Sequence, residues 1–480
     1  MTRRQTWRRW IAGGTLLSMA MLSACGGAGG SPAGNTDAGA GAAEGEKGNA
    51  GAKLAEPVTL TLSVQSSNRF LELAKQKFEE SHPNVKIEIK ESIAAPKSDG
   101  KTMIRKGEKP DPKDAEKFTS TVNTELMSGR ASDILITDEN FPYKKYADKK
   151  LLENIADLMK KDGSFKRDDY YSNVFDAMVY KDGIYALPAK LTLNGLLGNQ
   201  DALGGVSLND DVWTWHDFKA AVEPLAQDAN KDGVPDRYAL INTSGAALLS
   251  QMVDSSYGKL VNDANKKFDT GLFTDMLKLS KAMADAKLVT PERPERADIL
   301  FQAFSPLQYE DMILLSQMQF GGNGAFYKVP AYTDSKGLSF TSDMRLSINA
   351  KSGHKQEAWE FVKLLLSEDM QKTRELSGFA VNRKASLERQ AQLKEIGSGD
   401  GKNQIKLMTK DGKEFKPRPA EQKDIDAIEQ ALSELRVYAD TNPKVKAIVE
   451  QEAGPFFSGQ KSAEEVAKSV QNKVNTYLQE

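Results

Sequence analysis

The stretch VTLTLSVQSSNRFLELAKQKFEESHPNVKIEIKE (58–91) decides the fold class of this chain. Apolar residues alternate with Thr and Ser over 58–64, the period of two that predicts a strand with one buried face. Apolar side chains then recur at helical spacing over 70–78, and alternation returns over 85–89. Strand, helix and strand in so short a stretch predict a βαβ unit and a parallel sheet, with the loop 65–69 at its ligand edge.

Further strands and helices follow along the chain. Residues 134–136 predict a third buried strand that leads into a polar and aromatic loop, and 182–199 predict a pair of strands with a turn at Pro188. The lysine-rich stretch 95–117 is interpreted as a solvated loop. Amphipathic helices dominate the remainder, and the clearest are 353–370 and 462–479. The chain is therefore of the α/β class and long enough for two domains.

The N-terminus indicates export and anchoring. Arginines among the first nine residues precede an apolar run over 11–22, the pattern of a signal peptide and too short for a transmembrane helix. The sequence Leu-Ser-Ala-Cys that ends at Cys25 resembles the bacterial lipobox. We therefore expect a signal peptide over 1–24 and a lipidated Cys25, bearing acyl chains such as palmitate, at the mature N-terminus. The alternative is an ordinary signal peptide that is discarded with its cysteine.

Residues 25–56 are rich in Gly and Ala, carry a single large apolar side chain at Leu54, and predict a flexible tether. The predicted location is the extracellular face of the cell membrane, with membrane contact through the lipid anchor only. One cysteine excludes an internal disulfide. A formal net charge of −2 argues against nucleic acid as a partner.

Few enzymatic arrangements fit this composition. The three histidines, His82, His216 and His354, occur singly, and the sequence contains neither a G-x-S-x-G elbow nor an HExxH motif. A glycosidase needs only two carboxylates without a local signature, so an enzyme acting on polysaccharide stays open as an alternative. We nevertheless predict a protein that is not an enzyme and holds no catalytic cofactor.

DANKDGVPD (228–236) has the spacing of a calcium loop. The predicted oxygen ligands, at positions 1, 3, 5, 7 and 9, are Asp228, Asn230, Asp232, Val234 and Asp236. The usual glutamate at position 12 is replaced by Ala239. A structural calcium ion is therefore one interpretation, and a hydrogen-bonded turn without metal is the other.

Aromatic residues divide into core and ligand candidates. Trp359 and Trp215 lie in predicted helices and are expected in the core. Tyr143, Tyr309 and Tyr327 lie in predicted loops, where flat rings suit the apolar faces of sugars.

Taken together, these features resemble the extracellular solute-binding proteins of family 1, the receptors of carbohydrate ABC importers. The resemblance covers nearly all of residues 57–480. Besides the lipobox and the tether, its landmarks are VTLTLSVQSS (58–67), FPYKKYADKKLLENIADLM (141–159), DGIYALPAKLTLNGLLGNQDAL (182–203), WTWHDFKAAVEPLAQDANKDGVPD (213–236), LSINAKSGHKQEAWEFVKLLLSEDMQ (346–371) and PFFSGQKSAEEVAKSVQNKVNTYL (455–478).

The resemblance implies a two-lobe, periplasmic-binding-protein-like (Venus-flytrap) fold with a hinge of several chain crossings. YALPAKLT (185–192) resembles the first crossing and AFYKVPAY (325–332) the second, with LSINAKS (346–352) close to a third. The implied lobes are 57–189 with 328–350, and 190–327 with 351–480.

The resemblance also implies where ligand binds, which is the cleft between the lobes. The residues expected there are Gln65, Ser66, Asn68, Arg69, Asp138, Asn140, Lys190, Thr192, Tyr309 and Tyr327. The implied function is capture of an oligosaccharide by a monomer that presents it to an ABC permease. A receptor for a peptide or another non-sugar solute is a further alternative.

Overall fold

The stretch 58–91 folds as its pattern predicts. In the computed structural model the order is β1 (Val58–Val64), α1 (Arg69–Ser81) and β2 (Val85–Glu91), and β1 is parallel to β2. Leu60 and Leu62 are fully buried, because alternate residues of a strand point to the same face of the sheet. Asn68 caps α1, and its side-chain oxygen accepts a hydrogen bond from the Leu71 amide at 3.0 Å.

The structure describes most of the chain after the predicted tether. The described residues are 56–93, 112–226, 228, 231–233, 235–262, 266–292, 298–332, 337–396, 407–408 and 414–479. The predicted signal peptide, Cys25 and all but the last residue of the tether lie outside them. Among the described residues, no helix combines the length and the hydropathy needed to cross a bilayer.

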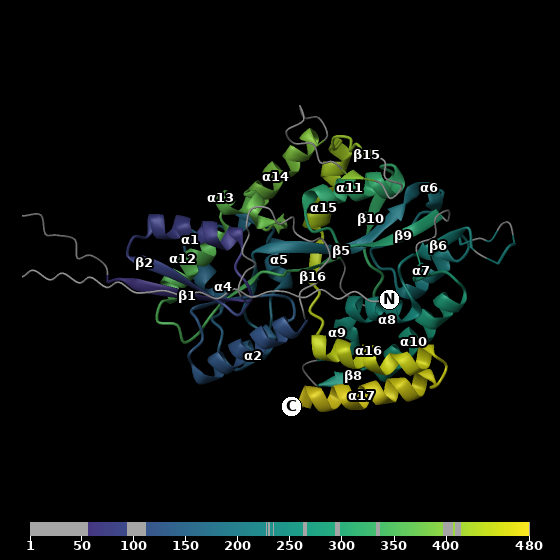
Figure 1. Ribbon diagram of the computed structural model, residues 1–480, viewed down its shortest axis with the longest axis horizontal. Coiled ribbons are helices and arrows are strands. Elements are labelled where there is room, and N and C mark those ends of the chain that lie inside the picture. The colour runs from purple at the N-terminus through teal and green to yellow at the C-terminus, as the bar shows by residue number, and fades with distance from the viewer. Residues whose placement is uncertain are drawn as a thin grey trace, which may run out of the picture. The chain divides into compact units, whose positions relative to one another are not determined.

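The first sheet has five strands in the order β2-β1-β3-β12-β4 (Figure 1). Its remaining members are β3 (Ile134–Thr137), β12 (Arg345–Ile348) and β4 (Leu187–Pro188). β3 is buried along its whole length and parallel to β1, which confirms the predicted third strand. β12 comes from much later in the chain and is antiparallel to β3 and β4, so the sheet is mixed.

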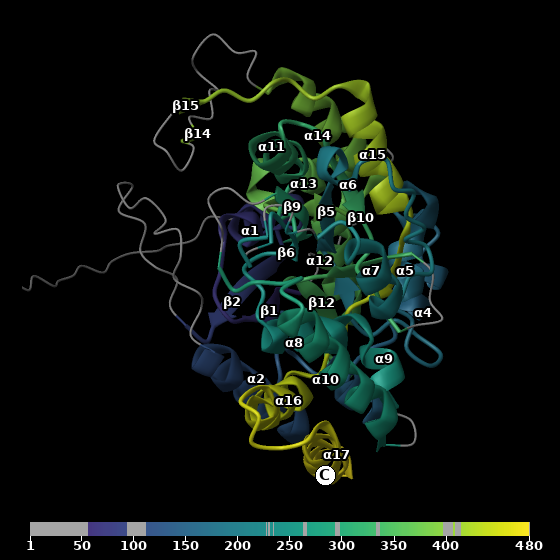
Figure 2. The same cartoon turned by 90° about the vertical axis from the view of Figure 1, so that its right-hand side faces the viewer.

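Helices lie on both sides of the first sheet. α1 and α12 (Lys355–Leu366) lie on one side and α2 (Pro112–Ser128) on the other (Figures 1 and 2). Smaller helices of this region are α3 (Tyr143–Asp148), α4 (Ile155–Lys161) and α13 (Glu368–Gln371), whereas α5 (Ser172–Ala177) packs on β16 of the second sheet. Trp359 of α12 is buried, as predicted. The predicted loop over 95–117 is wrong at its end, because α2 begins at Pro112 and buries Phe118.

The second sheet has seven strands centred on the long β5 (Lys190–Asn199). Its main path is β16 (Leu435–Tyr438), β11 (Leu338–Thr341), β5, β9 (Asp298–Phe304) and β6 (Arg237–Leu240), and β10 (Gly324–Tyr327) and β13 (Phe379–Ala380) also pair with β5. Gly195 of β5 admits the ring of Phe326 from β10. A Cβ at position 195 would lie 2.4 Å from Phe326 Cζ, so a larger residue cannot fit there.

A second core packs beside this sheet. Its helices are α6 (Gln200–Leu203), α7 (Trp215–Val222), α8 (Gly245–Ser255), α9 (Tyr257–Leu260), α10 (Thr270–Asp285), α16 (Pro443–Phe457) and α17 (Ala463–Gln479). Trp215 is fully buried, as predicted, and stacks edge-on against Phe218. Phe301 of β9 joins them, so the sheet and the helices share one apolar interior.

Three helices form a further layer. α11 (Tyr309–Phe320) packs on β10, α14 (Arg383–Gln392) on β13, and α15 (Gln422–Ser433) on α11 and α14. Two small two-stranded sheets complete the described elements: β7 (Val261–Asn262) with β8 (Lys267–Phe268), and β14 (Leu407–Met408) with β15 (Glu414–Phe415).

The chain passes between the sheets at two places that bear on the predicted hinge. β4 of the first sheet is followed by β5 of the second with only Ala189 between them, where the first crossing was predicted. Pro188 lies in β4 and does not form the predicted turn of a strand pair. The stretch 325–332 does not cross, because β10 stays paired with β5; the crossing lies at 342–344, between β11 and β12.

The predicted lobe boundaries differ from the packing in two regions. Residues 328–350 are predicted in the first lobe, but β11 (Leu338–Thr341) pairs with β5 of the second sheet. Residues 351–480 were assigned to the second lobe, but α12 packs on α1 and β12 of the first sheet. Its apolar stripe explains this, because Phe361 faces Phe78 of α1 with their ring centroids 5.3 Å apart. Residues 54–480 form one compact unit, and the division into two lobes stays a prediction.

Candidate functional site

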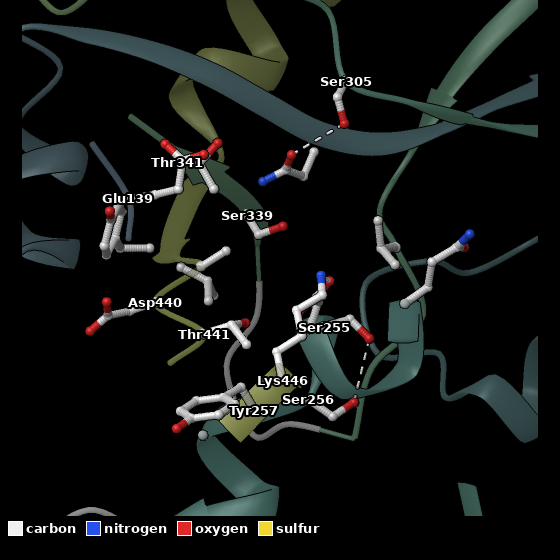
Figure 3. Close-up of a pocket in the computed structure, with 18 of the residues that line it drawn as sticks. Glu139, Ser255, Ser256, Tyr257, Ser305, Ser339, Thr341, Asp440, Thr441 and Lys446 are labelled. Carbon is white, nitrogen blue, oxygen red and sulfur yellow. Dashed lines mark hydrogen bonds and ion pairs between the residues drawn. The ribbon is translucent and has the colours of Figure 1, made fainter. Parts of the chain in front are cut away.

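A cavity of about 560 Å3, the inter-sheet cavity, is lined by segments from both sheets (Figure 3). The first sheet contributes the loop after β3 and the start of α3. The second contributes β5, β9, β11 and the end of β16, and the joins of α8 with α9 and of β16 with α16 complete the lining. This volume lies in the range of sites for small organic ligands.

Hydroxyl and amide groups line part of the wall formed by the second sheet, beside apolar residues such as Leu196, Phe304 and Val437. Asn194 of β5 accepts a hydrogen bond from the Ser305 hydroxyl at 3.3 Å. Ser339 and Thr341 lie two residues apart on β11, so their side chains point to the same face. These groups can each donate or accept hydrogen bonds, which suits a ligand with many hydroxyl groups.

The turn between α8 and α9 adds an aromatic side chain and two more hydroxyl groups. Ser255, Ser256 and Tyr257 come from this turn, and Figure 3 shows them together at one end of the cavity. The Lys446 ammonium lies 2.5 Å from an Asp254 carboxylate oxygen, which neutralises a charge that would otherwise face the ligand. Tyr257 is 8% exposed and its hydroxyl oxygen is buried, so a ligand can reach only part of the rest of this side chain.

The first sheet contributes a short wall of three residues. Glu139 and Asn140 follow β3, and Lys144 lies in the first turn of α3. The Asn140 amide and backbone N–H both donate to the Asp138 carboxylate, at 3.1 and 3.0 Å, which orders this loop. The Lys144 ammonium reaches across to Asp440 beyond β16, with 2.8 Å between Nζ and Oδ2.

Glu139 has an altered ionisation. Its side chain keeps contact with solvent, yet the surrounding cavity walls desolvate the carboxyl and raise its pKa, and the negative charges of Asp138 and Asp343 act in the same direction. The neutral form is therefore favoured more than in a free glutamate, and it can donate a hydrogen bond.

The predicted ligand residues are only partly brought together. Asn140 lines the cavity, and Asp138 orders its loop. The described cavity lining contains none of the other eight: Gln65, Ser66, Asn68, Arg69, Lys190, Thr192, Tyr309 and Tyr327. Asn68 is engaged as a helix cap. Lys190 donates to the Ser377 carbonyl at 3.0 Å and pairs with Asp343 at 3.1 Å.

The tyrosines predicted from loops lie elsewhere. Tyr309 begins α11, is 1% exposed and donates to the Ser386 hydroxyl at 2.7 Å, so it packs in the core. Tyr327 ends β10 and accepts a hydrogen bond from Gln200 at 2.8 Å. Tyr143 is buried in α3 beside Arg345. Each of these tyrosines lies in a helix or a strand, and the sequence alone did not specify which side of that element is buried.

Sequence reasoning missed the residues that contribute most of the lining. Tyr257 lies in SSYGK (255–259) and Tyr438 in RVYADTNP (436–443), two short polar and aromatic stretches at element boundaries. A polar and aromatic stretch at the boundary of a predicted element was the signal that could have identified both tyrosines. Thr341 carries no such signal, because it lies in a strand identified only by its pairing.

The Asx-rich loop forms part of a turn away from the cavity. The Asp228 carboxylate accepts hydrogen bonds from the backbone N–H groups of Asp232 and Gly233, at 3.1 and 2.8 Å. Asn230 and Val234 lie outside the described residues. The Lys287 ammonium donates to the Gly233 carbonyl, which places a cation at the loop. Within the described residues, no three His, Cys, Asp or Glu side chains gather as a metal site.

The sequence and the fold were compared with known proteins. A family model described as bacterial extracellular solute-binding protein matches residues 63–372. No curated protein matches the chain.

Solved structures share the fold at low identity. An extracellular solute-binding protein family 1 from Alicyclobacillus acidocaldarius has a TM-score of 0.55 at 15% identity, over 88% of this chain and 99% of that one. The sugar-binding protein MalE from Xanthomonas citri has a TM-score of 0.57 at 13% identity, over 88% and 97%. The ABC substrate-binding protein Lmo0181 from Listeria monocytogenes, in complex with cycloalternan, has a TM-score of 0.52 at 15% identity, over 88% and 100%.

Proposed function

Since this chain belongs to the family of bacterial extracellular solute-binding proteins, we propose that it captures an oligosaccharide in the inter-sheet cavity. The observation that carries the proposal is the lining of that cavity. Serine, threonine and asparagine side chains share the lining with apolar side chains such as Leu196 and Phe304, two tyrosines border it, and two of its lysines are paired with carboxylates. Hydroxyl and amide groups match the edges of a sugar ring, and aromatic rings match its faces.

The fold relatives support the same ligand class. Lmo0181 is described in complex with cycloalternan, and MalE is described as a sugar-binding protein. Binding then shifts the chain toward the conformation that contacts the sugar best, by as much as the sugar prefers that conformation.

The test begins with mass spectrometry of any ligand that co-purifies with the chain, followed by a thermal-shift screen of oligosaccharides. We expect a saturable rise in melting temperature with at least one saccharide, because ligand that binds only folded protein stabilises it. Tyr257→Ala should weaken that response. Tyr185→Ala, at a tyrosine outside the cavity lining, is the matched control and should keep it.

An enzyme acting on polysaccharide is the second candidate from the sequence. Our proposal requires that the bound saccharide is recovered unchanged after incubation. Product formation by the purified chain, abolished by Glu139→Gln, would favour the enzyme instead, because Glu139 is the cavity acid whose raised pKa suits a proton donor.

We further propose that Cys25 carries the lipid anchor, that residues 25–56 form the tether, and that an ABC permease receives the ligand. The lipobox-like sequence and the Gly/Ala-rich stretch support the first two, and the family supports the third. Metabolic labelling with a palmitate analogue should modify the parent chain and leave Cys25→Ser unlabelled. Label on Cys25→Ser would refute the anchor.

Calcium at the Asx loop is also a proposal. Asp228, Asp232 and Asp236 would supply carboxylates, and Asn230 and Val234 would supply the other oxygens, in a stabilising role only. The Lys287 ammonium competes for this loop, so the expected affinity is modest. Millimolar CaCl2 should raise the melting temperature of the parent chain but not of Asp232→Asn. Equal responses would remove calcium from the account.

A further inference from the structure

Arg345 is a fully buried cation at the crossing between the two sheets. It opens β12 and has no exposed surface. The described ion pairs include no carboxylate partner for it, and its Nε and Nη1 atoms have no hydrogen-bond partner among the described residues. Burying a cation without a paired anion is costly, so other contacts must offset that cost.

Two backbone carbonyls supply part of the compensation. Arg345 Nη2 donates to the carbonyl oxygen of Phe141 at 2.8 Å and to that of Asp138. These carbonyls lie on either side of Glu139 and Asn140, which form the first wall of the cavity. Arg345 therefore fixes the conformation of the loop that presents both side chains.

Two aromatic rings supply the rest, and they come from different layers. The guanidinium carbon lies 5.1 Å from the ring centroid of Tyr143 in α3 and 5.6 Å from that of Tyr438 in β16. Each distance falls within the range of a cation–π contact, which gains strength when both partners are desolvated. Tyr143 begins α3, which comes directly after β3 of the first sheet. Tyr438 belongs to the second sheet and packs on Phe340 of β11.

Tyr143 and Tyr438 contact Arg345 through the faces of their rings and not through their hydroxyl groups. Burial raises the pKa of both phenols, so neither carries charge near neutral pH. The Tyr438 hydroxyl has no hydrogen-bond partner among the described residues, although it is buried. Removing that hydroxyl alone should therefore leave the contact with Arg345 intact.

The same two segments meet again just beyond the rings. Lys144 follows Tyr143, Asp440 lies two residues after Tyr438, and their side chains form the 2.8 Å ion pair across the cavity. Arg345 thus holds the loop after β3, the start of α3 and the end of β16 in one arrangement, and all three contribute to the cavity lining.

We propose that Arg345 is a positioning residue that joins the two walls of the inter-sheet cavity through the rings of Tyr143 and Tyr438. Its use in ligand capture rests on the proposed function, whereas its effect on the walls can be measured without ligand. Losing the guanidinium or one ring should let the two sheet layers move relative to each other.

The experiment measures a distance across the cavity by pulsed electron spin resonance. Spin labels are attached at Glu80→Cys on α1 and Lys468→Cys on α17, both exposed, in the full chain with Cys25→Ser so that only these thiols react. The parent should give one narrow distance distribution without saccharide. Arg345→Lys keeps the charge but loses the planar fork, and should broaden the distribution or shift part of it to longer distance.

Tyr438→Leu and Tyr438→Phe form the matched pair. The leucine variant loses the ring and should behave like Arg345→Lys, whereas the phenylalanine variant keeps the ring and should match the parent. Melting temperatures confirm that each variant is folded, and Tyr438→Leu carries the test if Arg345→Lys does not fold.

Two results would overturn the proposal: unchanged distributions in both Arg345→Lys and Tyr438→Leu, or equal broadening in the leucine and phenylalanine variants. If the parent chain binds none of the screened saccharides, the proposed function is refuted. The distance measurement still tests the role of Arg345, because it is made without saccharide.

Discussion

The two walls of the inter-sheet cavity are unequal. The first sheet supplies three lining residues in one short segment, Glu139, Asn140 and Lys144. The second sheet and the helices beside it supply the rest, from segments that are far apart in the sequence. Affinity should therefore depend mainly on the second wall, whereas the first wall should act through its position.

The cores behind the walls give the largest expected effect. Phe301→Ala should lower the free energy of unfolding by about 3–5 kcal/mol and Leu62→Ala by about 2–5 kcal/mol, because each deletes a fully buried side chain. Urea unfolding measures both. In protein that remains folded, Phe301→Ala should weaken saccharide binding more than Leu62→Ala does. Equal losses of saccharide affinity in the two variants would contradict the expectation that the second wall contributes more to binding.

Side chains on the walls themselves come next. Tyr257→Ala should cost about 2 kcal/mol of binding free energy, roughly a thirtyfold loss of affinity, as for a buried aromatic contact. Asn140→Ala removes one polar contact and should cost about 1 kcal/mol, roughly fivefold. Calorimetry with the saccharide that co-purifies decides the order, and a larger loss for Asn140→Ala would reverse the comparison.

Asp162, at the end of α4, sets the expected pH dependence. Hydrogen bonds from Lys363 and Ser164 lower the pKa of Asp162, with Lys363 Nζ 2.6 Å from its Oδ2. A lowered pKa stabilises the fold above the unfolded-state pKa near 4, and this stability is lost as the pH falls below it.

Asp162→Asn should therefore lower the melting temperature at pH 7, by the equivalent of about 1.5 kcal/mol for a charged hydrogen bond. It should also flatten the decline below pH 4. If Asp162→Asn loses melting temperature below pH 4 as steeply as the parent does, the decline is caused by other carboxyl groups.

The ion pair between the walls should give the smallest effect. Lys144 and Asp440 are both partly exposed, so their coupling should be about 0.2–1 kcal/mol and should shrink in high salt. A double-mutant cycle with Lys144→Met and Asp440→Asn measures it. A coupling that does not change between low and 1 M salt would mean that the pair is more buried than its exposure indicates.

The fold was predictable from the sequence where neighbouring residues form the structure. Alternation over 58–64 and helical spacing over 70–78 are local signals, and the βαβ unit followed from them. Trp215 and Trp359 were placed in the core because aromatic residues on amphipathic helices are usually buried.

The site was much less predictable, because its residues converge from separate elements. Thr341 and Tyr438 meet through the pairing of β5 with β11 and of β11 with β16, and Tyr257 joins them from α9. Tyr309 shows the opposite case, since a polar and aromatic stretch proved to be the start of a buried helix. Long-range strand pairing, not local pattern, decides which side chains face the cavity.

The position of β12 in the sequence has a consequence for biosynthesis. β3 is wholly buried, yet the strand that covers its second edge is made roughly 200 residues later. At typical rates of translation that edge stays open for about 10–40 s. During this time an apolar strand edge can pair with another chain. The nascent protein therefore needs protection from aggregation until Ile348 has emerged, and passage through a membrane before folding would provide it.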